Sequence, residues 1–166
     1  MQAMALTRAP VMASHSAARA VGDVSRNLDD EQLLMLKENG GVVQTVAFRS
    51  YVNPEKNTAN RVALEALQQT IAAEMGVEIV DQRERRSMSA ADREAYNAAF
   101  QPVQEAVDSR RAAEVDAVAP PVDVSDFVDH IDYLVNLIGI EHVGISSDFD
   151  GGGGVEGWND ASETFN

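Results

Sequence analysis

Three polar residues in this sequence follow predicted strands and have side chains suited to chemistry. His15 stands in Ser14-His15-Ser16 directly after a short apolar run, where an imidazole can bind a metal through one ring nitrogen. Asp148 precedes a glycine run, Gly151 to Gly154, and a carboxylate beside a metal can take or give a proton. Arg26 carries a planar guanidinium whose geometry matches a carboxylate. The three residues are therefore candidates for a metal ligand, a proton-transfer group and a carboxylate-binding group.

Each of these residues also has a commoner structural explanation when it is taken alone. A histidine after a strand is usually a hydrogen-bonded structural residue. Aspartate and glycine both favour turns for conformational reasons, so Asp148 fits the start of a glycine-rich turn. Arg26 lies near Asp29 and Asp30 in the sequence and could form a surface ion pair with either of them.

Two further histidines are poor candidates for a metal site. His130-Ile131-Asp132 matches a His-x-Asp metal-binding pattern, but it falls inside a predicted amphipathic helix. Residues two apart on a helix project about 200° apart and do not converge on one ion. His142 stands at the start of a predicted strand, and we interpret it as a residue at the strand edge.

The elements that must position His15, Arg26 and Asp148 alternate between strand and helix. The apolar and β-branched runs predict buried strands, the run over residues 41–48 being typical of a strand covered on both faces, and the periodic runs predict helices. In chain order they are a strand over residues 9–13, a helix over 29–38, a strand over 41–48, a helix over 125–138 and a strand over 142–147. Such alternation is typical of a parallel sheet in an α/β protein. Reacting groups then lie just past the carboxyl ends of the strands.

Capping signals support both helices. Asp29 with Gln32 resembles a capping box, and Asn39-Gly40 supplies a stop, with Leu33, Leu34 and Leu36 expected to face inward. Ser125 is the expected N-cap of the later helix, in which apolar residues recur every three or four positions up to Gly139.

A long segment, residues 52–121, separates the second strand from the later helix. It is rich in Ala, Glu, Gln and Arg, and we expect an insertion of two helices, over residues 60–75 and 90–118. Gly76 would end the first, the run from Ser89 to Asp92 resembles a capping box at the start of the second, and Pro102 could kink it.

Composition narrows the classes of function. The 166 residues carry 13 basic and 27 acidic side chains, and the net charge of -14 argues against nucleic acid or an anionic membrane surface as partner. Without cysteine, any metal must be held by His, Asp and Glu. The first 13 residues lack a basic region followed by a sustained apolar run, so we expect neither a signal peptide nor a membrane span in this chain.

Five sequence blocks, in this order and spacing, resemble the membrane (renal-type) dipeptidases of peptidase family M19. The most specific is Ser-Asp148-Phe-Asp-Gly, and the blocks cover residues 9–16, 26–30, 40–44, 129–134 and 142–151. The resemblance implies a partial TIM (β/α)8-type barrel of the amidohydrolase superfamily, with parallel strands six to eight in residues 1–166 and a helical insertion at 52–121. Residues 1–8 would end the preceding helix, and residues 158–166 would match the loop before the last helix.

The resemblance also implies a zinc-dependent dipeptidase with two metal ions and a role for each candidate. His15 matches a zinc ligand, Arg26 matches the arginine that binds the free carboxylate of a dipeptide, and Asp148 matches the aspartate that transfers protons at the scissile amide. A metal-activated hydroxide would attack the peptide carbonyl. The partners implied are a dipeptide substrate and, for the complete enzyme, a second copy in a homodimer.

The family's other metal ligands have no match here. Its first-strand His-x-Asp pair, bridging glutamate and further histidine would lie upstream of residue 1, so we expect a C-terminal part that is inactive alone. Two alternatives stay open: a non-catalytic half-barrel that binds a complementary chain, and an amidohydrolase-type enzyme acting on other amides or lactams.

Overall fold

The computed structural model describes residue 4 and residues 6–164, which divide into two compact units. The first unit contains residues 1–58 and 121–166, and the second contains residues 59–120. Residues 1–8 were predicted to end a helix, and Met4 and Leu6 are helical. Residues 1–3 and 5 lie outside the described residues. Residues 165 and 166 of the expected final loop also lie outside them.

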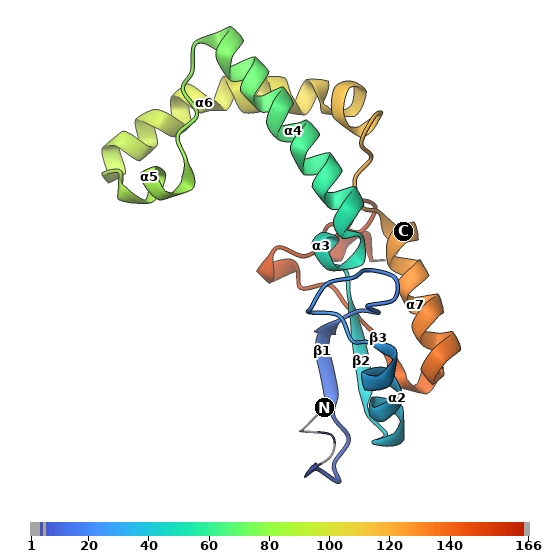
Figure 1. The fold of residues 1–166 in the computed structure, drawn as a ribbon. Helices are drawn as coiled ribbons and strands as arrows, with labels where there is room; N and C mark the ends of the chain where they lie inside the picture. Colours follow the sequence, from blue (N-terminus) through green and yellow to red (C-terminus); the bar gives the residue numbers. More distant parts are fainter. Residues whose placement is uncertain (1–3, 5, 165–166) are drawn as a thin grey trace. The chain divides into compact units, whose positions relative to one another are not determined.

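The first unit is built on a parallel three-stranded sheet in the order β1-β2-β3 (Figure 1). Its strands are β1 (Met12–Ser16), β2 (Val42–Val46) and β3 (Val143–Ser146). β2 pairs in parallel with both neighbours. The predicted α/β class with parallel strands is therefore confirmed, and the carboxyl ends of all three strands meet at one edge of the sheet.

Strand β1 differs from the sequence prediction in position and burial. It begins at Met12 instead of residue 9 and includes His15. Ala13 pairs with Val43 and Ser16 with Thr45, so β1 has one residue more than β2 in this interval, which is a β-bulge. The strand was expected to be buried, but Met12 is 63% exposed.

Strand β3 is also less buried than expected. Its Ile145 is 61% exposed, and no further described strand pairs with the free edge of β3. A continuous apolar run was interpreted as a strand covered on both faces. Here only the central strand β2 approaches that state, with Val43, Thr45 and Val46 fully buried.

Two helices pack together against one face of the sheet. They are α2 (Asp30–Glu38) and α7 (Val124–Ile138), and both lie beside the strands in Figure 1. Leu33 and Leu36 of α2 share a buried cluster with Val43 of β2 and with Leu134 and Ile138 of α7. Burying aliphatic side chains of this size contributes about 1.5–3 kcal/mol each.

The helix boundaries confirm most of the capping signals. Asp29 and Gln32 form the reciprocal capping box of α2, and Gly40 follows the helix with φ 73°. The prediction for Leu34 was wrong, since its side chain is 44% exposed on the outer face of α2. The N-cap of α7 is Asp123 instead of Ser125, and Asp123 forms a capping box with Asp126.

The expected insertion contains more helices than the two that were predicted. A short helix, α3 (Arg49–Val52), precedes it, and its own helices are α4 (Pro54–Met75), α5 (Gln82–Ser87), α6 (Ala90–Arg111) and a π-helical turn (Ala112–Asp116). The second unit has its own core, in which Leu67 and Ile71 of α4 pack with Val103, Val107 and Val115. Ser89 caps α6 as expected, and α6 is a single helix with Pro102 inside it.

None of the described helices combines the length and apolar character needed to cross a membrane.

Candidate functional site

His15 and Asp148 face each other at the carboxyl edge of the sheet. The Nε2 atom of His15 lies 3.6 Å from Oδ1 of Asp148. β1 and β3 both pair with β2, so their backbones are separated by two strand spacings, roughly 9.5 Å. The two side chains therefore cross the end of β2 to meet. Both are accessible to solvent, with 44% of the His15 side chain and 30% of the Asp148 side chain exposed.

The β-bulge of β1 places His15 at this edge. Ser14 and His15 occupy the irregular interval, and both side chains are exposed although adjacent strand residues normally point to opposite faces. The Oγ of Ser14 lies 2.9 Å from Nδ1 of His15. The other ring nitrogen, Nε2, is directed toward Asp148 and is the atom available for a ligand.

Asp148 adopts an uncommon backbone conformation. Its φ of 54° is left-handed, and no other described non-glycine residue has a positive φ. The glycines that follow permit a tight return of the chain: a Cβ on Gly153 would lie 2.0 Å from the carbonyl oxygen of Ser147. The backbone N–H of Gly154 then donates to the carbonyl of Ala47 at the end of β2. The glycine run thus holds Asp148 against the carboxyl ends of the strands.

Arg26 lies on the loop between β1 and α2, and its backbone is tied to the site. The hydroxyl of Ser16, next to His15, donates to the carbonyl of Arg26 at 2.9 Å. The Arg26 guanidinium stands over the ring of Tyr51, 5.7 Å from its centroid. Among the described contacts, none joins this guanidinium to His15 or Asp148. The structure therefore pairs His15 with Asp148 and leaves Arg26 on the adjoining loop.

Asn27 fixes the loop that carries Arg26, and the sequence patterns did not single it out. Its side chain is fully buried, accepts from the N–H of Ala17 and donates to the carbonyls of Gly22 and Tyr51. A buried amide with all of these bonds made is costly to disrupt. The only signal in the sequence was its position beside Arg26.

The other two histidines have structural partners. His130 is fully buried; its Nδ1 accepts from the N–H of Ala18, and its Nε2 lies 2.7 Å from the carbonyl of Val52. Burial lowers the pKa of His130, although the bond to Val52 opposes this shift. His142 bonds the carbonyl of Gly41 through Nδ1. Neither ring is placed to join the pair at the sheet edge.

The described residues do not by themselves complete a metal site. His15 and Asp148 supply one nitrogen and one carboxylate. Zinc takes four protein donors at structural sites and three protein donors with one water molecule at catalytic sites. In residue 4 and residues 6–164, no three His, Asp or Glu side chains are grouped so that they could hold an ion. The donor types suit zinc, but their number does not.

An ion-pair cluster joins the start of α4 to the start of α7 within the first unit. Lys56 donates to the carboxylates of Asp123, at 2.9 Å, and Asp126. Burial opposes the charge on Lys56, but the bonds to Asp126 and Asp123 raise its pKa. The bond from Lys56 lowers the pKa of Asp123. The cluster thus reinforces the capping box of α7.

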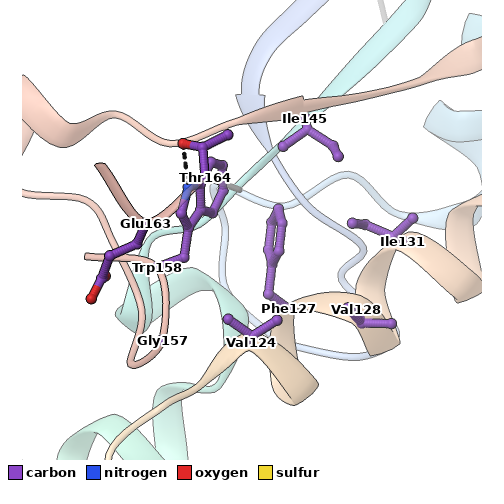
Figure 2. A pocket seen from close by; sticks show the side chains of 9 residues that line it. All are labelled: Val124, Phe127, Val128, Ile131, Ile145, Gly157, Trp158, Glu163 and Thr164. Carbon is purple, nitrogen blue, oxygen red and sulfur yellow. Dashed lines mark hydrogen bonds between the residues drawn. The ribbon is translucent and has the colours of Figure 1, made fainter. Parts of the chain in front are cut away.

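An apolar pocket of about 270 Å³ lies between α7 and the C-terminal loop (Figure 2). Phe127, Val128 and Ile131 line it from α7, Ile145 lines it from β3, and Trp158 lines it from the loop. The Trp158 ring also contacts Phe149, the residue after Asp148, at 5.3 Å between centroids. The apolar periodicity of the helix predicted over residues 125–138 includes Phe127 and Ile131, but it did not indicate a pocket.

These features define an α/β protein whose parallel strands bring a histidine and an aspartate together at their carboxyl edge. A family model described as "Membrane dipeptidase (Peptidase family M19)" matches residues 1–166, and the chain belongs to this family.

Individual relatives agree with this assignment. The chain is 30% identical to dipeptidase aclJ of Aspergillus oryzae over 159 residues, which are 95% of this chain and 23% of that protein. It is 60% identical to dipeptidase 3 of Macaca fascicularis over 38 residues, which are 23% of this chain and 8% of that protein. The structure of the probable dipeptidase PvdM from Pseudomonas aeruginosa matches with a TM-score of 0.58 and 37% identity. That match covers 98% of this chain and 38% of the PvdM chain. The chain thus spans well under half the length of these relatives.

Proposed function

We propose that this chain forms one part of the active site of a zinc-dependent dipeptidase. The observation that carries the proposal is the 3.6 Å approach of His15 Nε2 to Asp148 Oδ1 in a chain of the membrane dipeptidase family. In this account β1, β2 and β3 are strands six to eight of a TIM-type barrel, and residues 52–121 are an insertion on its loop side. The parallel pairing and the match to PvdM support a partial barrel of this family, and the numbering of the strands is part of the proposal.

Each candidate residue has a separate task in this proposal. His15 Nε2 is a metal ligand, and Asp148 Oδ1 exchanges a proton with the reacting amide. Zinc, when bound, would polarise the carbonyl and lower the pKa of water. Arg26 holds the free carboxylate of the dipeptide, which its planar guanidinium can bind through two parallel hydrogen bonds. The Tyr51 ring beneath it and the buried Asn27 beside it fix the direction of approach.

The 166-residue chain alone is proposed to be inactive. Its described residues offer two donors at the site, and a zinc ion held by two protein donors would exchange readily with water and other ligands. The remaining donors would come from another part of the barrel.

A chimera tests the proposal without assuming where the natural protein begins or ends. Residues 1–166 replace the matching segment of PvdM, and the purified chimera is assayed for hydrolysis of a chromogenic dehydrodipeptide and for zinc content. We expect zinc-dependent hydrolysis that a chelator abolishes. His15→Ala should lower both zinc content and rate, whereas His142→Gln, which changes a histidine just before β3 and away from the strand ends, should alter neither.

Hydrolysis that does not change with His15→Ala would refute the metal-ligand role. A folded chimera, verified by circular dichroism, that binds zinc and cleaves a β-lactam but no dipeptide would favour the alternative amidohydrolase reaction.

A second candidate, a half-barrel that binds a complementary chain, is favoured by the free edges of the sheet. β1 and β3 each have one unpaired edge among the described strands, and Met12 and Ile145 expose apolar surface there. The test mixes the 166-residue chain with the remaining segment of PvdM. Co-elution of the two pieces with restored hydrolysis supports complementation, and separate elution contradicts it.

A further inference from the structure

An open pocket of about 500 Å³ in the second unit is lined by charged and polar side chains from α5 and the start of α6. The lining residues are Gln82, Arg85, Arg86 and Arg93. We propose that this pocket binds a small oxyanion with at least two negative charges, of the kind presented by a diphosphate group. This binding is separate from the proposed dipeptidase function.

The chemistry of the lining defines the ligand class. Three guanidinium groups contribute only hydrogen-bond donors and three positive charges, and the single carboxamide of Gln82 adds two more donors. None of the described residues that line the pocket carries a carboxylate. A matching ligand therefore carries several acceptor oxygens and more than one negative charge, because planar guanidinium forks bind phosphate oxygens in pairs.

The arginines of this pocket lack the ion pairs that other arginines of the chain make. Arg110 pairs with Glu74 and Glu114, and Arg61 pairs with Glu65. Among the ion pairs between described residues, none involves Arg85, Arg86 or Arg93. Although the chain has 27 acidic residues, these three arginines form no ion pair with a described carboxylate, and their guanidinium groups are available to bind an anion.

Two acidic residues that neighbour these arginines in the sequence make hydrogen bonds at helix starts. Asp81 caps α5, its carboxylate accepting from the N–H groups of Arg83 and Glu84. The carboxylate of Asp92 accepts from the hydroxyl of Ser89 at the start of α6. Residues 81–94 are neutral overall, because Glu84 and Glu94 together with Asp81 and Asp92 balance four arginines. Neither glutamate lines the pocket. The positive charge is thus local to the pocket surface.

Neutral groups hold two of the three guanidiniums in place without cancelling their charge. Arg85 lies over the ring of Tyr96, 5.3 Å from its centroid, and donates to Oδ1 of Asn97 at 3.3 Å. Arg93 donates to the carbonyl of Met88 at 3.2 Å. Side chains that are already ordered lose less conformational entropy when they bind a ligand.

Calorimetric titration of the metal-free 166-residue chain with inorganic pyrophosphate tests the proposal, with EDTA present to exclude a metal-mediated effect. We expect saturable binding to one site, weakening strongly as salt rises from about 20 to about 200 mM because the lining groups are exposed and screened. The triple variant R85Q/R86Q/R93Q should weaken binding by about tenfold or more, since each lost charge-assisted bond contributes to affinity.

The control variant R8Q/K37Q/R61Q removes the same charge from exposed positions elsewhere and should keep the wild-type affinity. Acetate at equal ionic strength should not compete, because it carries a single charge. Absence of saturable binding, or equal weakening in both triple variants, would overturn the proposal. Unchanged circular dichroism of R85Q/R86Q/R93Q shows that the exposed substitutions leave the helices folded.

Discussion

The Nδ1 atom of His130 accepts a hydrogen bond from the backbone N–H of Ala18 at 3.1 Å. This bond connects helix α7 to the loop that follows the strand bearing His15. Because Nδ1 accepts, the ring must donate from Nε2 to the carbonyl of Val52, which lies 2.7 Å away. A neutral imidazole satisfies both bonds, whereas protonation would set an N–H of the ring against the N–H of Ala18.

The first prediction concerns the dependence of stability on pH. Burial lowers the pKa of His130 below its ordinary 6.5, with nearby Asp129 and Asp126 opposing the shift. Above pH 6.5 the ring is neutral in both folded and unfolded chains. As pH falls below 6.5, the unfolded chain gains the proton first, so the free energy of unfolding should fall until the folded pKa is passed. Urea unfolding followed by the fluorescence of Trp158, the single tryptophan, measures this.

His130→Phe should flatten this pH dependence while lowering stability by about 2 kcal/mol, since the N–H of Ala18 loses its partner. His142→Gln is the control and should retain the slope. An identical slope in His130→Phe and wild type would contradict the assignment.

The second prediction concerns the left-handed backbone of Asp148. Asp148→Val should lower the free energy of unfolding by about 1–2 kcal/mol, because a β-branched residue is strained at φ 54°. Asp148→Asn should leave stability nearly unchanged, since asparagine tolerates this conformation. Asp150→Val, on an exposed neighbour without positive φ, should change stability by about 0.5 kcal/mol or less. Equal losses at positions 148 and 150 would argue against a strained loop.

The third prediction concerns the Lys56 cluster. Lys56→Met should lower the free energy of unfolding by about 1 kcal/mol, because it removes the cation that bridges Asp123 and Asp126. The lowered pKa of Asp123 makes its contribution present above pH 3.8 and lost as pH falls. The raised pKa of Lys56 makes its contribution present below pH 10.5 and lost as pH rises. Stability from the cluster should therefore be greatest between these limits.

Urea denaturation of Lys56→Met and wild type across this pH range measures the loss. The difference in the free energy of unfolding should be largest between pH 3.8 and pH 10.5. Arg61→Met, which breaks the exposed pair with Glu65, should cost only a few tenths of a kcal/mol. A cost for Lys56→Met no larger than that of Arg61→Met would show that the cluster contributes little.

The fourth prediction concerns substrate binding by Arg26 in the PvdM chimera. Arg26→Lys keeps the charge but loses the planar fork, so KM for a dipeptide should rise about tenfold or more with a smaller change in kcat. Tyr51→Leu removes the ring under the guanidinium and should raise KM less. Arg61→Ala serves as the control. A KM unaffected by Arg26→Lys would exclude carboxylate binding by this residue.

Local signals predicted the helices well because their causes lie within a few residues. The capping pair Asp29 and Gln32 and the stop at Gly40 act over one turn, and the structure has both. Leu34 was placed inward because three leucines in a row of four suggested a wide apolar face. Only packing against α7 and β2 decides which two of them are buried.

The arrangement of the candidate site depends on contacts distant in sequence. The approach of His15 to Asp148 follows from parallel pairing of β1 and β3 with β2, which the strand pattern predicted. The β-bulge in β1 has no local sequence signature, so His15 was expected after the strand instead of within it. The position of the Arg26 guanidinium over Tyr51 likewise depends on α3, an element that the sequence did not reveal.

The most direct test of the account is the effect of Asp148→Asn on kcat in the PvdM chimera, measured together with zinc content. Asparagine keeps the shape and the left-handed backbone but cannot exchange the proton. We expect kcat to fall by about a hundredfold or more while the zinc content stays at the level of the unsubstituted chimera. Wild-type kcat in a zinc-loaded Asp148→Asn chimera would contradict the claim that His15 and Asp148 serve one hydrolytic site.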